Sequence, residues 1–377
     1  MTDEPPDVRI TVDSESDGSE SDPYLHEGPR VHTPEHTLVV PVTETLLDGS
    51  SGIDVQRFLR TATALAADND GRVLLFGVEA VGSESALETV REHSRTAQPA
   101  DDRDAVVETV EKRRRQLAQI ADVAHQLDPE VPVHAVVRAT TDTTAAILDA
   151  GDDSSGTAIL LARGTGLDDG WLLARSTVDV VLADAECNVF VENIGSPGGD
   201  NALYVPDVSE HVVASLSESD AEPIDSILLA VNDGPHAALA TEAARAVASA
   251  ADASITVLHV VSDEDGPQAT SDGYDLLKFT ESIIGEDVPV ETELREAADE
   301  TEEILAEATA HDVVTIGAPE EQSRLEGLVF NSIQQTLSTQ SEATVLMARD
   351  TDRTMRSLYY RWKNGIESAD EESESTN

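Results

Sequence analysis

The sequence has 377 residues and a formal net charge of −51, from 75 acidic and 24 basic side chains. This length fits two ordinary domains with tails. The excess of carboxylates excludes a nucleic-acid-binding protein, because such binding requires basic side chains that neutralise phosphates. The sequence contains no run of 18 apolar residues that would predict a membrane span. Its start, MTDEPPDVRI, lacks the basic and apolar parts of a signal peptide. The sequence therefore predicts a cytoplasmic protein.

The acidity itself has two interpretations. Disorder is a common consequence of high charge, but the periodic apolar segments between the tails argue against it there. Adaptation to molar salt fits better, because the Debye length falls to about 3 Å at 1 M and self-repulsion becomes tolerable. The low aromatic content of 3% and the scarcity of lysine agree with this. We therefore interpret the charge as halophilic adaptation and not as part of the mechanism.

In chain order, short β-branched runs alternate with Ala-rich amphipathic stretches such as 105–127 and 239–252. This alternation predicts right-handed β-α-β units with parallel sheets. The strands predicted in the first half are 38–42, 72–78, 131–137, 158–162 and 189–192. Those predicted in the second half are 226–231, 254–261, 288–294, 313–317 and 344–348.

The two sets of strands form an internal repeat. EVPVHAVVRATTDTTAAIL (130–148) aligns without a gap over DVPVETELREAADETEEIL (287–305). The aligned pairs include Arg138 with Arg295 and Asp142 with Asp299. The repeat predicts two copies of one α/β domain. The predicted organisation is an acidic disordered tail (1–33), a first domain (34–197), a linker (198–222), a second domain (223–350), and a basic amphipathic helix with an acidic disordered tail (351–377).

Each predicted strand is a continuous apolar run, as strands buried on both faces should be. The predicted fold class is therefore α/β, with two tandem doubly wound domains that each contain a five-stranded parallel sheet flanked by helices. Such sheets bind ligands beyond the carboxyl ends of their strands, at the switch point between the first and fourth strands. In the second domain these ends carry Asn232-Asp233-Gly234, Ser262 and Gly317, and a ligand site is expected there.

SILLAVNDGPHAALATEAARAVASAADASITVLHVV (226–261) resembles the first strand, first helix and second strand of universal stress protein domains. AEATAHDVVTIGA (306–318) resembles their fourth strand, and ADAECNVFVE and QSEATVLMAR resemble their last strand. The resemblance covers 223–350 and, largely through the repeat, 34–197. It implies an adenine-nucleotide-hydrolase-like fold and pairing of the two domains through their last strands. In ATP-binding members it also implies an Asp after the first strand and G-x2-G-x9-G-[ST] after the fourth.

VTIGAPEEQSRLEGLVFNS (314–332) retains part of that phosphate motif. Glu321 stands where the second glycine belongs, and with Glu320 it repels a triphosphate. No cofactor is certain, and ATP or another adenine nucleotide is the candidate. The cofactor-binding residues that the resemblance implies are Asn232, Asp233, Val260, Gly317, Gly327, Asn331 and Ser332. No residue is assigned as catalytic or as a metal ligand.

The first domain departs further from the motif. Thr43 stands where the Asp would be, Ala162 replaces the glycine that ends the fourth strand, and Arg175-Ser176 aligns with the final Gly-Ser. We interpret this loop as unable to bind a nucleotide. Elsewhere, Cys187 is predicted to be a buried thiol, and the basic run 111–115 is predicted to be a solvated helix face.

The segment RDTDRTMRSLYYRWKNGIE (349–367) combines basic residues with an apolar stripe at helical spacing. One interpretation is an interfacial helix that docks on an anionic membrane or a partner protein. The other is a helix that covers its own domains, and the sequence leaves both open. The stripe consists of Met355, Leu358, Tyr359, Trp362 and Ile366.

Three functions are consistent with these observations. The leading one is a universal stress protein-like regulatory or stress-response protein that is not an enzyme and has an unknown protein partner. The second is a peripheral regulator of a membrane transporter that docks through 353–366, since similar tandem domains occur fused to transporters. The third is an ATP-binding or ATP-hydrolysing α/β protein. The sequence shows no general base at a suitable place, which counts against hydrolysis.

Overall fold

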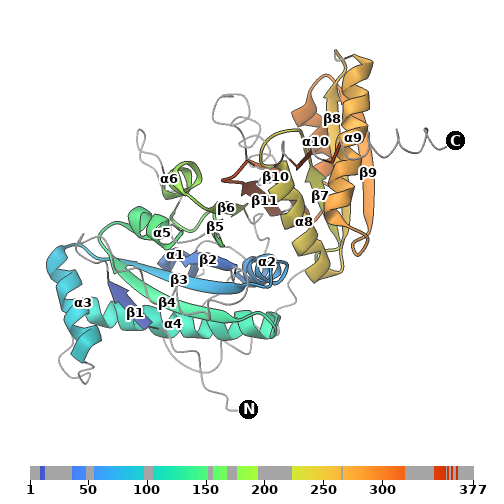
Figure 1. Cartoon of the computed structure of the whole chain (residues 1–377). Helices are drawn as coiled ribbons and strands as arrows, with labels where there is room; N and C mark the ends of the chain where they lie inside the picture. Colours follow the sequence, from blue (N-terminus) through green and yellow to red (C-terminus); the bar gives the residue numbers. More distant parts are fainter. Residues whose placement is uncertain are drawn as a thin grey trace. The chain divides into compact units, whose positions relative to one another are not determined.

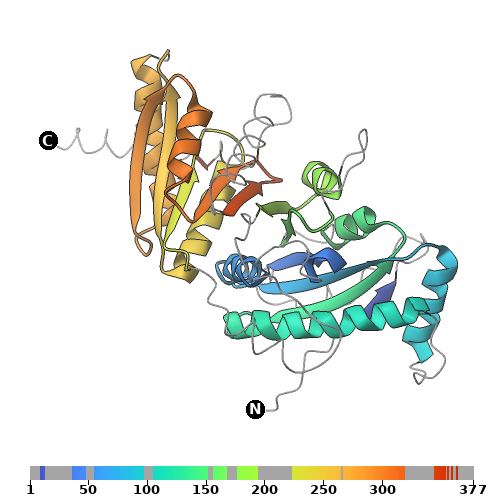
Figure 2. The same cartoon turned by 180° about the vertical axis from the view of Figure 1, so that it is seen from behind.

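The computed structural model describes residues 9–12, 36–47, 55–96, 105–151, 156–167, 176–193, 223–264, 266–318, 344–353, 355, 358–359 and 362–363. The chain divides into two compact units, one built on Met1–Val191 and the other on Glu222–Asn377. Each unit contains a parallel sheet with helices on both faces (Figures 1 and 2). The predicted α/β fold class is therefore confirmed.

The sheet of the first unit has the strand order β1-β4-β3-β2-β5-β6. The pairings β1·β4, β3·β4, β2·β3 and β2·β5 are parallel. All residues of β2 and β5 are buried, as expected when helices cover both faces. The strands are β1 (Arg9–Val12), β2 (Thr37–Val42), β3 (Arg72–Ala80), β4 (Val133–Thr140), β5 (Thr157–Ala162) and β6 (Asn188–Asn193).

The helices of the first unit lie on opposite faces of this sheet according to the direction of each connection. Helices α2 and α4 pack on each other and on the strands of one face, and α5 packs on the other face (Figures 1 and 2). The change of face follows from right-handed crossovers, because the chain reverses direction across the sheet after β4. The helices are α1 (Glu44–Leu47), α2 (Val55–Ala67), α3 (Glu84–Thr96), α4 (Ala105–Leu127), α5 (Thr143–Gly151) and α6 (Thr177–Asp184).

The second unit has the parallel strand order β11-β10-β7-β8-β9. Helices α8 and α9 contact each other on one face, and α10 packs against β7 and β8 (Figure 1). The elements are β7 (Ser226–Ala230), α8 (Ala237–Ala251), β8 (Ser254–Ser262), α9 (Pro267–Ile284), β9 (Val290–Ala297), α10 (Glu300–Ala308), β10 (Val313–Gly317) and β11 (Thr344–Arg349). None of the helices in the described parts of the chain is long and apolar enough to cross a membrane.

Every predicted strand is present in the structure, with end points that differ by a few residues. The prediction of disorder for residues 1–33 is wrong at one place, because β1 pairs in parallel with β4 and brings Ile10 opposite Val137. The run RITV is β-branched but spans four residues, which is too short for periodicity to identify. It forms a strand by adding to the edge of an existing sheet, so the described sheet of the first unit has six strands where five were predicted.

The aligned arginines of the repeat have the same structural role in the two units. On β4, Arg138 Nη1 lies 3.0 Å from Asp149 Oδ2 of α5. On β9, Arg295 lies 3.0 Å from Glu303 and 2.7 Å from Glu307 of α10. The hydrogen bond from Arg295 lowers the pKa of Glu307, and burial partly opposes that effect. The two arginines thus tie β4 to α5 and β9 to α10, the helix that follows each strand.

The aligned aspartates of the repeat also share one role, at the start of that same helix. Asp142 Oδ1 accepts a hydrogen bond from the backbone N–H of Ala145 at 3.0 Å. Asp299 Oδ1 accepts one from the N–H of Glu302 at 3.0 Å. Both are N-caps, which satisfy backbone donors that the first helical turn leaves unpaired.

Replacing either cap with alanine is expected to lower the free energy of unfolding by about 1 kcal/mol. Urea unfolding of Asp142→Ala and Asp299→Ala measures this loss in each unit. The matched controls are Asp142→Asn and Asp299→Asn, because asparagine accepts the same bond and should retain nearly all the stability. Equal losses in the alanine and asparagine variants would show that the caps do not carry the effect.

Candidate functional site

The second sheet reverses its strand order between β7 and β10. From β7 the chain continues to β8 on one side, whereas β10 continues to β11 on the other. Because all these strands are parallel, their carboxyl ends lie at one edge of the sheet. Asn232-Asp233-Gly234 follows β7, Ser262 ends β8 and Gly317 ends β10. The predicted switch point is therefore present, with these residues around it.

The turn after β7 is shaped by the side chain of Asn232. Its Oδ1 accepts a hydrogen bond from the N–H of Gly234 at 3.0 Å. A Cβ atom at Gly234 would lie 2.7 Å from that oxygen, so glycine permits the turn. Asn232 and Asp233 are both exposed. Asn232 thus holds the backbone while Asp233 presents a carboxylate at the edge.

Gly317 brings the end of β10 close to the start of α8. A Cβ atom there would lie 3.3 Å from both Cβ and the carbonyl carbon of His236. His236 is 5% exposed, and its Nδ1 accepts the backbone N–H of Asp350 at 3.1 Å. Burial lowers the pKa of His236, and the charges of Arg349 and Arg353 lower it further. The charge of Asp350 acts in the opposite direction and raises it. Sequence reasoning missed this histidine, because nothing in DGPHAALA distinguishes it from a solvated residue.

Val260 and His259 lie side by side in sequence on β8 but have different roles. Val260 is 6% exposed and belongs to the core. His259 Nδ1 lies 2.9 Å from the carbonyl oxygen of Val231, to which it can only donate. His259 therefore ties the ends of β7 and β8 together.

Helix α9 lies close against the ends of these strands. A Cβ atom at Gly273 would lie 2.7 Å from Leu294 Cδ1 and 2.8 Å from His259 Cδ2, so glycine permits the approach. The helix starts with Pro267 in its first turn and ends at Gly285, whose φ of 83° is a conformation that glycine adopts readily. Both ends are therefore set by local sequence.

The remaining predicted binding residues, Gly327, Asn331 and Ser332, lie outside the described residues, as do Glu320 and Glu321. The structure thus brings Asn232, Asp233 and Gly317 to one edge of the sheet, whereas Val260 lies in the core within β8. The phosphate motif that follows Ala318 stays a prediction.

At the equivalent edge of the first unit, the side chains bond to the protein itself. Thr43, which stands where the resemblance predicts an Asp, donates from Oγ1 to the carbonyl oxygen of Thr165 at 2.7 Å. Thr165 in turn donates from Oγ1 to the carbonyl oxygen of Ala162 at 2.7 Å. Ser176 Oγ accepts the N–H of Asp179 at 3.1 Å and caps α6. These hydroxyls have structural partners.

A buried ion pair also lies at that edge. Arg113 of α4 is 4% exposed, and its Nη2 lies 3.2 Å from Glu79 Oε2 at the end of β3. Burial raises the pKa of Glu79, and the charge and hydrogen bond of Arg113 oppose that rise. The prediction that 111–115 forms a solvated face is therefore wrong for Arg113. The prediction of a solvated face agrees with Arg114, whose side chain is partly exposed and pairs with Glu111 of the same helix at 3.1 Å.

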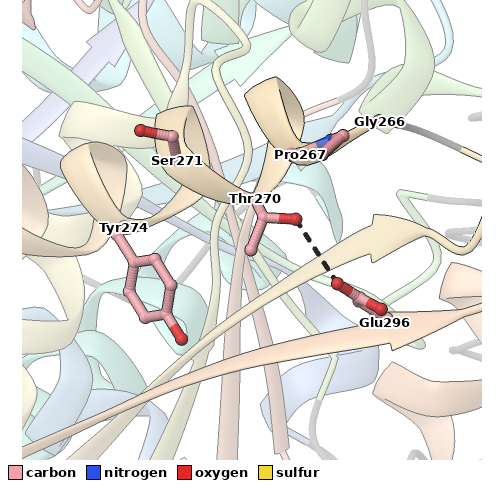
Figure 3. Close-up of a pocket in the computed structure, with 6 residues that line it drawn as sticks. All are labelled: Gly266, Pro267, Thr270, Ser271, Tyr274 and Glu296. Atoms are coloured by element: carbon pink, nitrogen blue, oxygen red, sulfur yellow. Dashed lines mark hydrogen bonds between the residues drawn. The ribbon is translucent and has the colours of Figure 1, made fainter.

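A shallow groove of about 520 Å³ lies on the second unit where α9 starts beside the end of β9. Thr270 Oγ1 donates to Glu296 Oε1 across it at 3.3 Å (Figure 3). The aromatic ring in the groove belongs to Tyr274, which is 55% exposed. The groove lies one strand beyond the switch point and contains none of the predicted site residues. Its lining is Gly266, Pro267, Thr270, Ser271, Tyr274 and Glu296.

Within the described ranges, no group of three or more His, Cys, Asp or Glu side chains is placed to hold a metal ion. Cys187 is buried, as predicted, and forms no disulfide.

Comparison with known proteins identifies one family. Residues 223–349 match the model of the universal stress protein family, and no curated protein matches the chain. A solved universal stress protein from Archaeoglobus fulgidus DSM 4304 is 17% identical, covers 84% of this chain and 96% of its own, and has a TM-score of 0.48. The cytoplasmic domain of a prokaryotic cation chloride cotransporter is 12% identical, with 84% and 96% covered and a TM-score of 0.47. A universal stress protein in complex with cAMP is 14% identical, with 33% and 97% covered and a TM-score of 0.27.

Proposed function

We infer that this chain, whose residues 223–349 match the universal stress protein family, is a regulatory stress-response protein that binds a ligand without transforming it. Its proposed ligand site is the carboxyl edge of the second sheet. The observation that supports this most is the placement of Asn232, Asp233 and Gly317 around the switch point between β7 and β10. The candidate ligand is ATP or another adenine nucleotide.

The side chains at this edge suit binding better than catalysis. Asp233 is exposed and its carboxylate can accept hydrogen bonds from ribose hydroxyls. Gly317 has no side chain to keep a ligand from the backbone. His236 is a poor general base, because it is buried, its pKa is lowered and its Nδ1 already accepts the N–H of Asp350. These features support a binding protein over an ATP-hydrolysing enzyme.

The first unit is proposed to have lost its own ligand site. The hydrogen bond from Thr43 to Thr165 supports this, since it engages the group that stands in the position of the Asp in ATP-binding relatives. The capping bond between Ser176 and Asp179 supports it as well. One ligand for each chain is therefore expected.

Equilibrium dialysis of the full chain with ATP and with AMP in molar KCl tests the proposed site. Asp233→Ala and Ser332→Ala are each expected to weaken binding roughly tenfold, since each removes a hydrogen bond to the ligand. The matched control is Ser176→Ala, the counterpart of Ser332→Ala in the first unit, which should leave the affinity unchanged. Failure of the unaltered chain to bind either nucleotide would refute the nucleotide part of the proposal.

The transporter-regulator alternative depends on docking through residues 353–366. The described aromatic residues of that segment, Tyr359 and Trp362, pack against Phe279 of α9. They favour the interpretation that the segment covers its own domain, and they leave less apolar surface for docking elsewhere. Membrane fractionation that depends on Tyr359 and Trp362 would favour the alternative. Pairing of the two domains through their last strands and a cytoplasmic location stay predictions.

A further inference from the structure

After β11 the chain passes the start of α8, beside the proposed ligand site. We call the described residues between Thr351 and Lys363 the strap. It begins beside the start of α8, where the N–H of Asp350 donates to His236 Nδ1 at 3.1 Å. Arg353, with a φ of 51°, turns the chain, and its charge acts on His236. The strap therefore starts at the ends of β7 and β10.

The far end of the strap is held on α9, which follows β8. The Tyr359 ring lies edge-on to Phe279 with centroids 5.4 Å apart, and the Trp362 ring lies 5.5 Å from the same ring. Phe279 is 4% exposed, so these contacts extend the core of the unit. Met355, in the middle of the strap, is 2% exposed. Three described residues of the apolar stripe, Met355, Tyr359 and Trp362, thus pack within the unit.

Charged groups complete the attachment. Lys363 Nζ lies 3.0 Å from Asp275 and 3.3 Å from Asp272, both on α9. Burial raises the pKa of Tyr359, and the charge of Lys363 limits that rise. The negative charges of Asp275, Asp272 and Asp233 raise the pKa further. Asp233 is the exposed carboxylate of the proposed ligand site.

These contacts follow the order of the strands. The chain leaves β11, bonds through Asp350 to His236 beside the end of β10, and reaches the helix after β8 through the strap, in a sheet ordered β11-β10-β7-β8-β9. It thus traverses the edge at which a ligand of this fold would lie. We propose that the strap is an intramolecular cover of the ligand site, so that ligand binding requires its release from α9. This inference rests on the proposed function.

Release of such a cover couples ligand binding to a change at the protein surface. A ligand that binds the uncovered state alone has an apparent affinity reduced by the fraction of molecules in that state. Binding would expose Tyr359 and Trp362, whose aromatic faces are the kind of surface that protein partners recognise. Concentrated salt screens the Lys363 pairs but not the aromatic contacts. The aromatic contacts are therefore the better target for substitution.

The test uses Trp362 as a reporter in the full chain. The sequence has two tryptophans, so Trp171→Phe leaves Trp362 alone, and acrylamide quenching of its fluorescence reports whether the strap is docked. In that background, Tyr359→Ala with Lys363→Glu is expected to increase quenching and to tighten ATP binding roughly tenfold in equilibrium dialysis. Tyr274→Ala is the matched control. This tyrosine lies on α9, the helix against which the strap packs, but its side chain is exposed, so its loss should change neither the quenching nor the ATP affinity.

A second measurement needs no change to the strap. Saturating ATP is expected to increase the quenching of Trp362 in the Trp171→Phe chain. An unchanged quenching, or a released strap with unchanged or weaker ATP affinity, would overturn the cover while the proposed function stands. Absence of ATP binding in every variant would instead refute the proposed function, and the cover with it.

Discussion

Replacing Arg113 with alanine is expected to lower the free energy of unfolding by about 3–5 kcal/mol at neutral pH. The reason is that Arg113 and Glu79 are 4% and 12% exposed at their side chains and lie 3.2 Å apart. Without the guanidinium, the Glu79 carboxylate stays buried and uncompensated. Urea unfolding followed by circular dichroism measures the loss.

The same variant should depend on pH in a definite direction. Burial raises the pKa of Glu79 in the folded protein, and Arg113 limits that rise. A carboxyl with a raised folded-state pKa contributes stability below its unfolded pKa and loses it as the pH rises. Removing Arg113 enlarges the rise, so the deficit of Arg113→Ala should be greatest near neutral pH and shrink in acid. A deficit that is constant with pH would indicate lost packing alone.

Arg113→Met with Glu79→Leu is the control for that result. Apolar side chains of similar volume avoid the desolvation of both charges, and such replacements are often neutral or stabilising. The double variant should therefore recover nearly all the stability that Arg113→Ala loses. A double variant as unstable as the single one would show that the ion pair itself is required.

Phe279→Ala is expected to cost about 3–5 kcal/mol in the free energy of unfolding, because it removes a buried aromatic ring from the core. Phe279 is 4% exposed and also contacts Tyr359 and Trp362. Its loss should free the strap as well as weaken α9. Urea unfolding gives the first effect, and acrylamide quenching of Trp362 in the Trp171→Phe background gives the second.

Phe279→Leu separates the two effects of that substitution. Leucine retains much of the apolar volume, so the unfolding free energy should fall by less than in Phe279→Ala. It lacks a ring, so the edge-to-face contact is lost and the quenching of Trp362 should still rise. Unchanged quenching in both variants would show that the strap is held by other contacts.

The sequence was sufficient to predict the strands of both units and the switch point. Continuous runs such as VVTIG at 313–317 have an unambiguous period and length. The repeat added the alignment of Arg138 with Arg295 and of Asp142 with Asp299. Here local patterns and tertiary packing agree, which is why the prediction succeeded.

The parts that could not be predicted depend on contacts between distant residues. The charge run that contains Arg113 resembles a solvated face, and Glu79, its partner on β3, is far away in sequence. Likewise, nothing local to His236 indicates that Asp350 donates to it across more than a hundred residues. The apolar stripe of the strap was visible, but only Phe279 shows what it packs against.

The edge strands β1 and β9 protect their sheets differently, and this affects how molecules meet in concentrated salt. The net charge of −51 keeps chains apart in dilute buffer, but at 1 M salt its field extends only about 3 Å. Protection then has to come from the strand edges themselves. In the first sheet β1 covers β4, whereas in the second the edge strand β9 carries Glu291, Glu293 and Arg295, and ionised side chains on an edge discourage a foreign strand from adding to it. Solubility at high ionic strength would thus depend on the side chains of such edge strands more than on the total charge.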